Sequence, residues 1–230
     1  KAEKANKSKA DFLNVISHEL RTPLTVMLGN LPLLTDPDDM PETEEIVEIA
    51  TDIEEAGTHL LGLINELLDL SKIEEGRLEL NIEPLHIRDC IKESLSLVKS
   101  LIVRKKLDLI EEVEDFSFIG DAIRMKQVII NLLGNAAKFT DKGSITIVSK
   151  IEGNKAHLII RDTGCGIKEE YKSQIFDVFK QVDSSVIRAN SGSGLGLAIS
   201  KKLIEMHNGT IDVESEYGVR SDFCITLPIL

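Results

Sequence analysis

Residues 46–70 read IVEIATDIEEAGTHLLGLINELLDL, and this stretch decides the fold of the first part of the chain. Its apolar residues recur at alternating steps of three and four positions: Ile46, Ile49, Ile53, Ala56, Leu60, Leu63, Leu67 and Leu70. Such a repeat averages about 3.5 residues and is typical of a coiled-coil seam. The stretch therefore predicts a long amphipathic helix that packs against another helix.

A second amphipathic helix precedes it. The apolar residues of this earlier helix follow the same spacing: Leu13, Ile16, Leu20, Leu24, Met27 and Leu31. The acidic, proline-containing segment TDPDDMP, residues 35–41, separates the two helices. Two long helices joined by a short turn form an antiparallel hairpin. Because the apolar stripe is wider than one hairpin can cover, we expect two chains to pair into a four-helix bundle, which is a homodimer.

A second domain follows the hairpin. The helical pattern fades at Gly76, and Pro84 begins a mixed pattern, so we expect a hairpin domain over residues 1–76 and another domain over residues 77–230. Residues 143–162, GSITIVSKIEGNKAHLIIRD, alternate like two strands that meet in a hairpin turn. Further elements are expected as helices over 87–103 and 121–139 and from about 195, and as strands over 209–215 and 222–229. Antiparallel strands with separately gathered helices predict an α+β fold.

Composition narrows the class of protein. The chain has 230 residues, of which 42% are hydrophobic and 29% charged, which is a globular composition. A net charge of −12 argues against binding to nucleic acid. No apolar run is long enough to span a membrane, and no secretory signal opens the chain. The three cysteines form no CxxC pair, so we interpret them as reduced thiols of a cytoplasmic segment. Because the first residues read as the middle of a helix, we expect this segment to be part of a longer protein.

The first candidate site is ISHELRTPL, residues 16–24. At 100° per residue, His18 lies about 160° from the apolar stripe and therefore faces solvent. Glu19 is its neighbour, and Thr22 lies one turn further along the same face. An exposed imidazole beside a carboxylate can act as a nucleophile with its base. The alternative is a solvated helix face that carries an incidental histidine. Pro23 is expected to bend or loosen the helix.

Two further motifs carry polar groups suited to a nucleotide. In NLLGNAAKF, residues 131–139, Asn131, Asn135 and Lys138 share one helix face. Amide oxygens can ligate Mg²⁺ and a lysine can meet phosphate, although such residues can also be ordinary surface groups. In DTGCGI, residues 162–167, an aspartate opens a turn whose glycines permit close backbone approach. On its own, this motif is also compatible with an ordinary turn.

The last motif is GSGLGLAI, residues 192–199, in which three glycines lead into an apolar helix. This arrangement offers backbone N–H groups to phosphate. It is neither the dinucleotide fingerprint nor a Walker loop, because their required glycine and lysine positions are absent. The polar stretch over residues 181–191, which carries Arg188, is interpreted as a mobile lid.

Taken in this order, the motifs resemble those of sensor histidine kinases of the HisKA type, and the resemblance covers essentially the whole chain. SHELRTPL is similar to the H-box, NLLGNAAKF to the N-box, DTGCGI and GSGLGLAI to the two glycine boxes, and IFDVFKQVD to the F-box. The resemblance implies a dimerisation and phosphoacceptor hairpin followed by an ATP-binding α/β sandwich of Bergerat type. It also implies transfer of the ATP γ-phosphoryl group to a histidine and then to an aspartate of a response-regulator receiver domain.

The resemblance also implies residue roles. His18 would accept the phosphoryl group, Glu19 would be its base, and Thr22 would orient water for phosphatase activity. Asn135 would hold Mg²⁺, and Asp162 would bind the adenine amino group of ATP. The implied ATP-binding set is Asn131, Asn135, Lys138, Phe139, Asp162, Gly164, Gly166, Ile167, Arg188, Gly192, Ser193, Gly194, Leu195, Gly196 and Leu197.

Rival classes share some of these motifs. ATP hydrolases of the same superfold activate water with a glutamate at the position of Asn131, and an amide cannot act as a base. A catalytically inactive dimer module conflicts with the presence of His18, Asn135 and Asp162. One departure is Arg220, which stands where the family usually has glycine and is expected to stiffen a turn without affecting the site.

Overall fold

The computed structural model describes residues 2–35, 41–178 and 194–229, with side chains from residue 14 onwards. The chain divides into two compact units, residues 1–75 and 76–230. The second unit begins at Gly76, which has a φ of +64°, a left-handed conformation that glycine adopts readily and that commonly ends a helix. The first unit is helical and the second combines helices with a sheet, so the predicted two-domain α+β fold is confirmed. None of the described helices is long and apolar enough to cross a lipid bilayer.

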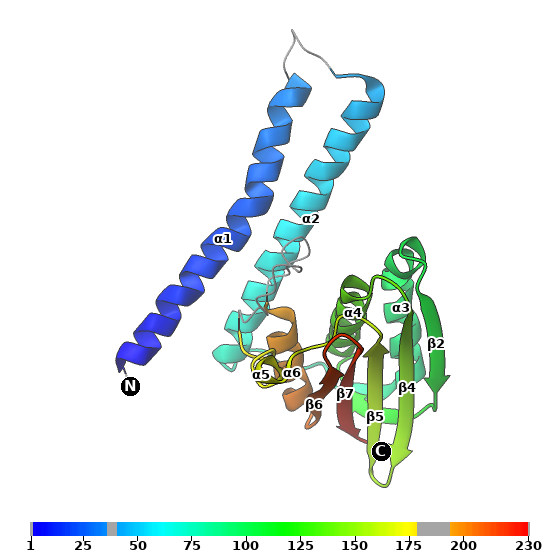
Figure 1. Ribbon diagram of the computed structural model, residues 1–230. Helices are drawn as coiled ribbons and strands as arrows, with labels where there is room; N and C mark the ends of the chain where they lie inside the picture. Colours follow the sequence, from blue (N-terminus) through cyan, green and yellow to red (C-terminus); the bar gives the residue numbers. More distant parts are fainter. Residues whose placement is uncertain (1, 36–40, 179–193, 230) are drawn as a thin grey trace. The chain divides into compact units, whose positions relative to one another are not determined.

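The first unit is a helical hairpin (Figure 1). It consists of α1, Ala2–Thr35, and α2, Thr43–Glu74, which run in opposite directions. The start of α2 is capped, because the Glu45 carboxylate accepts a hydrogen bond of 3.2 Å from the backbone N–H of Glu42. Its end is closed by a 3.0 Å hydrogen bond from the Glu75 N–H to the carbonyl of Ser71.

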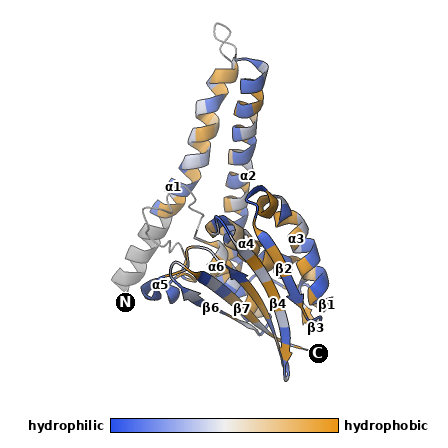
Figure 2. Ribbon diagram, turned by 45° about the vertical axis from the view of Figure 1, so that its right-hand side comes forward, coloured by the Kyte–Doolittle hydropathy of each residue, from blue (hydrophilic) through white to orange (hydrophobic). Residues whose placement is uncertain are grey.

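The hairpin leaves much of its apolar surface uncovered. Leu63 and Leu70 are buried, whereas the other positions of the repeat in residues 46–70 are half-buried. Apolar residues recur along both helices (Figure 2). From residue 14 onwards, the large exposed ones among the described residues are Leu24, Val26, Leu28, Leu31, Leu33, Val47, Leu61, Ile64 and Leu68. An apolar surface of this length is typical of a helix pair that associates with further helices.

The second unit contains a five-stranded sheet. In spatial order the strands are β2 (Asp108–Val113), β4 (Ser144–Glu152), β5 (Lys155–Asp162), β7 (Arg220–Pro228) and β6 (Thr210–Glu216). The remaining elements are β1 (Glu83–His86) paired with β3 (Ser117–Gly120), and the helices α3 (Ile87–Arg104), α4 (Ala122–Phe139), α5 (Glu169–Lys172) and α6 (Gly196–Met206). The helices α3, α4 and α6 pack on one face of the five-stranded sheet (Figure 1).

The core lies between this sheet and its helices. In β5, Leu158 and Ile160 are fully buried, whereas Arg161 between Ile160 and Asp162 is only half-buried. Because side chains alternate along a strand, Asp162 points to the same face as Leu158 and Ile160. The helix α4 supplies the opposing layer, including Met125, Ile129, Leu132 and Leu133. An acidic side chain is therefore placed at the end of an apolar strand face, beside the helix layer.

The predicted helices and the hairpin of residues 143–162 are observed. The helix bounds of the second unit agree to within one or two residues, whereas α1 and α2 extend further than the apolar repeats that predicted them. In that hairpin Glu152 pairs with Lys155. The strands β1, β2 and β3 are not predicted by the sequence. The predicted strands pair antiparallel, as expected, whereas the unpredicted β2 pairs in parallel with β4. The difference follows from the chain path, because β3 and α4 lie between the two strands and carry the chain back to the same end of the sheet.

Candidate functional site

Asp162 is the most buried acidic group among the predicted site residues. Asp162 is 4% exposed, and its Oδ1 accepts a 2.9 Å hydrogen bond from the N–H of Gly164. Burial raises the pKa of the carboxyl to about 6, an effect to which the nearby Asp222 carboxylate adds and which the Gly164 N–H opposes. The remaining carboxylate oxygen is thus a strong acceptor in a poorly solvated place, suited to a donor such as an amino group.

The turn after Asp162 requires its glycines. A Cβ at Gly164 would lie 2.3 Å from the carbonyl oxygen of Phe139 at the end of α4. Gly166 has a φ of +63°, and a Cβ there would lie 2.1 Å from the carbonyl oxygen of Glu216. The Cys165 N–H also donates to the Phe139 carbonyl, at 3.3 Å. Residues 162–167 therefore form a backbone-lined turn that is pressed against both α4 and the end of β6.

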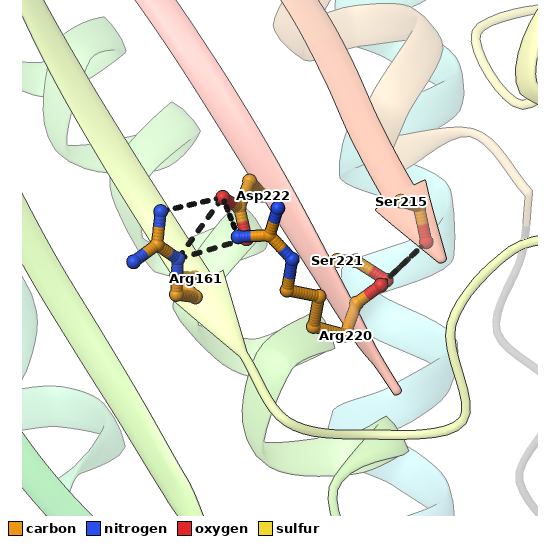
Figure 3. Close-up of polar contacts among 5 residues, drawn as sticks. All are labelled: Arg161, Ser215, Arg220, Ser221 and Asp222. Carbon is orange, nitrogen blue, oxygen red and sulfur yellow. Dashed lines mark hydrogen bonds and ion pairs between the residues drawn. The ribbon is translucent and has the colours of Figure 1, made fainter. Parts of the chain in front are cut away.

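Ser215 of β6 holds the far end of this turn, and the sequence does not single it out. Its Oγ accepts a 2.8 Å hydrogen bond from the Ile167 N–H and donates one of 2.7 Å to the Arg220 carbonyl. The same oxygen lies 3.1 Å from the Oγ of Ser221 on β7 (Figure 3). Ser215 thereby connects the glycine turn with the last two strands of the sheet.

The neighbouring acidic residue, Asp222, is bound by two arginines (Figure 3). Arg161 donates to it from Nε and Nη2, with a shortest distance of 2.7 Å, and Arg220 donates from Nη1 at 3.0 Å. The unusual Arg220 therefore has Asp222 as its electrostatic partner. Ser221, which lies next to Asp222 in the chain, pairs with Asp162 across β5 and β7.

A second group of predicted residues lies on α4. Asn131 donates from Nδ2 to Oγ of Ser200 at 2.9 Å, and Asn135 donates from Nδ2 to Oδ1 of Asn131 at 3.5 Å. The Oδ1 of Asn135 makes no hydrogen bond within the described part of the chain. An amide oxygen with this freedom is a suitable ligand for Mg²⁺. The Lys138 ammonium lies 5.2 Å from the centre of the Phe139 ring.

The start of α6 faces these asparagines. Gly194 has a φ of +69°, Leu195 is buried, and a Cβ at Gly196 would lie 2.4 Å from Oδ1 of Asn131. Leu197 follows in the first turn and is half-buried. The first backbone N–H groups of a helix are a general binding site for phosphate, so this helix start and Asn135 can serve one triphosphate. The predicted residues Arg188, Gly192 and Ser193 lie outside the described residues.

The remaining predicted residues lie on α1, in the first unit. The His18 side chain is 77% exposed, and its Nδ1 lies 4.0 Å from Oε1 of Glu19. Thr22 donates a 3.2 Å hydrogen bond to the His18 carbonyl. Pro23 lies inside α1, and because proline has no N–H, the Glu19 carbonyl lacks its usual helical donor there.

The structure thus gathers Asn131, Asn135 and Gly196 at one place in the second unit, and Phe139, Asp162 and the glycine turn at the adjoining end of α4. Sequence reasoning missed three supporting residues. They are Ser200, Ser215 and Lys105, whose ammonium donates to the Lys138 and Thr140 carbonyls at 2.8 and 3.1 Å.

Two family models match the chain. Residues 8–76 match the His Kinase A (phospho-acceptor) domain, and residues 120–230 match the histidine kinase-, DNA gyrase B-, and HSP90-like ATPase family. Over 99% of its length the chain is 39% identical to the circadian input-output histidine kinase CikA of Synechococcus elongatus and 40% identical to the sensor histidine kinase RcsC of Escherichia coli. It spans 31% and 24% of the length of these relatives.

Solved structures of histidine kinases are also similar to this chain. The histidine kinase ThkA in complex with the response regulator protein TrrA is similar over 100% of this chain and 64% of that one, with a TM-score of 0.72 and 27% identity. The isolated catalytic domain of ThkA is similar over 65% of this chain and 99% of that one, with a TM-score of 0.58 and 30% identity. Full-length ShkA in complex with AMPPNP is 28% identical, with a TM-score of 0.70, over 95% of this chain and 46% of that one.

Proposed function

Because this chain belongs to the histidine kinases, we propose that it transfers the γ-phosphoryl group of ATP to His18 and from there to an aspartate of a response-regulator receiver domain. The observation that carries the proposal is the solvent-exposed His18 with the Glu19 carboxylate beside it, on a hairpin that precedes an ATPase-type unit. Residues 1–76 would be the dimerisation and phosphotransfer domain, and residues 77–230 the ATP-binding domain.

In the first step, one ring nitrogen of His18 attacks the γ-phosphorus. A P–N bond forms, the bond between the γ-phosphorus and the bridging oxygen breaks, and ADP leaves with that oxygen. Glu19 takes the proton from the other ring nitrogen, for which its present distance of 4.0 Å from Nδ1 has to shorten. In the second step an aspartate oxygen of the regulator attacks the same phosphorus, the P–N bond breaks, and Glu19 returns the proton to the imidazole of His18.

The second unit would bind the nucleotide at its two gathered groups of residues. The free oxygen of Asp162 would accept from the adenine amino group, and the glycine turn would lie against the base. Asn135 would ligate Mg²⁺, which would reduce the charge on the phosphate groups. Asn131, Lys138 and the first N–H groups of α6 would contact the phosphates.

Two finer proposals concern partners. The large exposed apolar residues in the described part of the hairpin are expected to be covered by a second copy of the chain, which gives a four-helix bundle. The complex of ThkA with its response regulator supports a receiver domain as the second partner of this chain. Phosphatase activity towards that regulator is proposed for the same helix face, with Thr22 as the residue that orients water.

The test is incubation of the chain with radiolabelled ATP and Mg²⁺, followed by acid or base treatment. Label that survives base and is lost in acid is expected, because this is the behaviour of a phosphorus–nitrogen bond. The His18→Ala variant is expected to lose the label and still bind ATP. The matched control is His59→Ala, which removes another exposed histidine from the same hairpin. Equal labelling of the His18→Ala variant would refute the proposal.

A further inference from the structure

Ser200 lies one turn beyond the start of α6, and its hydroxyl reaches across to α4. It is 2% exposed, and its Oγ accepts the 2.9 Å hydrogen bond from Nδ2 of Asn131. A serine that only completes its own helix would bond to its own backbone, as Ser94 of α3 does with the Cys90 carbonyl. Ser200 instead connects two helices that each carry residues of the proposed nucleotide site.

We infer that Ser200 is a positioning residue of this site, which holds Asn131 so that the neighbouring Asn135 presents its oxygen to the cation of a bound nucleotide. The inference rests on the proposed function, since it assumes that a nucleotide and its cation bind here. Ser200 itself would touch neither of them.

The chain of amides gives the first argument. Asn131 uses its NH₂ group for Ser200, so its Oδ1 is left for the NH₂ group of Asn135. With its NH₂ group turned towards Asn131, Asn135 has its oxygen free for a cation. The link between the two amides is long, at 3.5 Å, and is therefore weak. This weak hydrogen bond can orient the Asn135 amide only if the Asn131 amide is itself fixed. The hydrogen bond to Ser200 fixes it.

Steric contact gives the second argument. The Oδ1 of Asn131 lies so close to Gly196 that a Cβ there would come within 2.4 Å of it. The Asn131 amide is therefore confined between the start of α6 and the hydroxyl one turn further on. Gly196 belongs to the helix start that is proposed to bind phosphate, and Asn135 is the proposed metal ligand. Because Mg²⁺ must contact phosphate and ligand together, a bond that fixes α6 against α4 sets the spacing on which its binding depends.

The experiment measures the affinity of the full chain for AMP-PNP by calorimetry, once with Mg²⁺ and once with a chelator. The ratio of the two affinities reports the contribution of the cation. For Ser200→Ala we expect this ratio to fall about two- to tenfold, which is the range of one net hydrogen bond, while the affinity without cation stays at the parent value. The matched control is Ser94→Ala, which removes another buried helical serine and is expected to leave the ratio unchanged.

A double-mutant cycle tests the route through Asn131. In an Asn131→Ala background, Ser200→Ala is expected to have no further effect on the ratio, because the group that it holds is gone. Ser200→Cys keeps a weaker partner at the same place and is expected to lie between the parent and the alanine variant. If Ser200→Ala does not fold, the test rests on Ser200→Cys. An affinity ratio of this variant equal to that of the parent would then overturn the inference.

Other outcomes separate the inference from the proposed function. If the parent binds AMP-PNP with a cation effect and Ser200→Ala shows the same ratio, the positioning role is wrong and the proposed function stands. An equal loss of affinity with and without cation would mean that Ser200 only packs the helices together, which also overturns the inference. If the parent itself shows no binding of AMP-PNP, the proposed function fails first.

Discussion

The sharpest test of the proposed nucleotide site is Asp162→Asn, because it is expected to change stability and binding in opposite directions. The pKa of this carboxyl is raised from 3.8 to about 6, chiefly by burial. A difference of about two pKa units corresponds to about 3 kcal/mol, by which the ionised carboxylate destabilises the folded state at neutral pH. Asparagine carries no charge, and its oxygen can still accept from the Gly164 N–H.

The net gain is smaller than this limit, because the new NH₂ group needs its own partner. We expect Asp162→Asn to raise the free energy of unfolding by about 1–3 kcal/mol at pH 7.5. In a domain of this size, one kcal/mol moves Tm by about 2–4 °C, so the gain is roughly 2–12 °C. ATP affinity is expected to fall about tenfold to a hundredfold, because the charged acceptor for the adenine amino group is lost.

The assay is thermal unfolding without nucleotide from pH 7.5 to pH 5, with calorimetric titration of ATP at pH 7.5. Since the folded state of the parent holds the Asp162 proton up to about pH 6 and the unfolded chain releases it near 3.8, this group stabilises the parent as pH falls through 6. The Tm advantage of the variant is therefore expected to shrink below pH 6. The control Asp108→Asn, at an exposed position on β2, is expected to show no such advantage.

Two results would refute this reasoning. A Tm difference that is absent or independent of pH would show that burial does not destabilise the carboxylate. Unchanged ATP affinity would remove Asp162 from the adenine site, whatever the stability data show.

Three further predictions concern other parts of the chain. Thr22→Ala is expected to keep autophosphorylation and to slow the loss of phosphate from a phosphorylated regulator mixed with the protein and ADP, and equal dephosphorylation would contradict this. Light scattering is expected to show the full chain as a dimer at micromolar concentration and a fragment of residues 77–230 as an ATP-binding monomer, whereas a monomeric full chain would count against the bundle. The buried Thr140 hydroxyl has no hydrogen-bond partner in the described part of the chain, so Thr140→Val is expected to raise stability by about 1–3 kcal/mol in chemical denaturation, and a loss would show that the hydroxyl is needed.

The sequence predicted the elements whose pattern is local. Residues 46–70 repeat about every 3.5 positions, which fits a helix and not a strand. Residues 143–162 alternate, which fits strands and not a helix. The strand β2 escaped prediction because DLIEEV places acidic residues on both of its faces, as an exposed edge strand allows. Its parallel pairing with β4 is a property of the chain path, for which no local pattern exists.

The same distinction applies to the site. Asn131, Asn135 and Asp162 stand in recognisable motifs, so they could be proposed from the sequence. Ser200 and Ser215 could not be, because their partners lie 69 and 48 residues away along the chain. No sequence pattern around a serine indicates a hydrogen bond to a distant residue. Only the folded arrangement of α4, α6 and β6 brings these serines to their partners.

The helix α4 shows why stability and binding are in conflict in this unit. One side of it buries Leu132, Leu133 and Ala136 in the core, and the adjoining side carries Asn131 and Asn135 of the proposed nucleotide site. Because both sides belong to one helix, the buried apolar residues cannot move without moving the two asparagines. The fold therefore holds the asparagines rigidly. At the end of the neighbouring strand, the same packing buries the Asp162 carboxylate and thereby destabilises the empty protein. A search for more stable variants of this chain would therefore select changes at residue 162, and the variants it returned would bind ATP poorly.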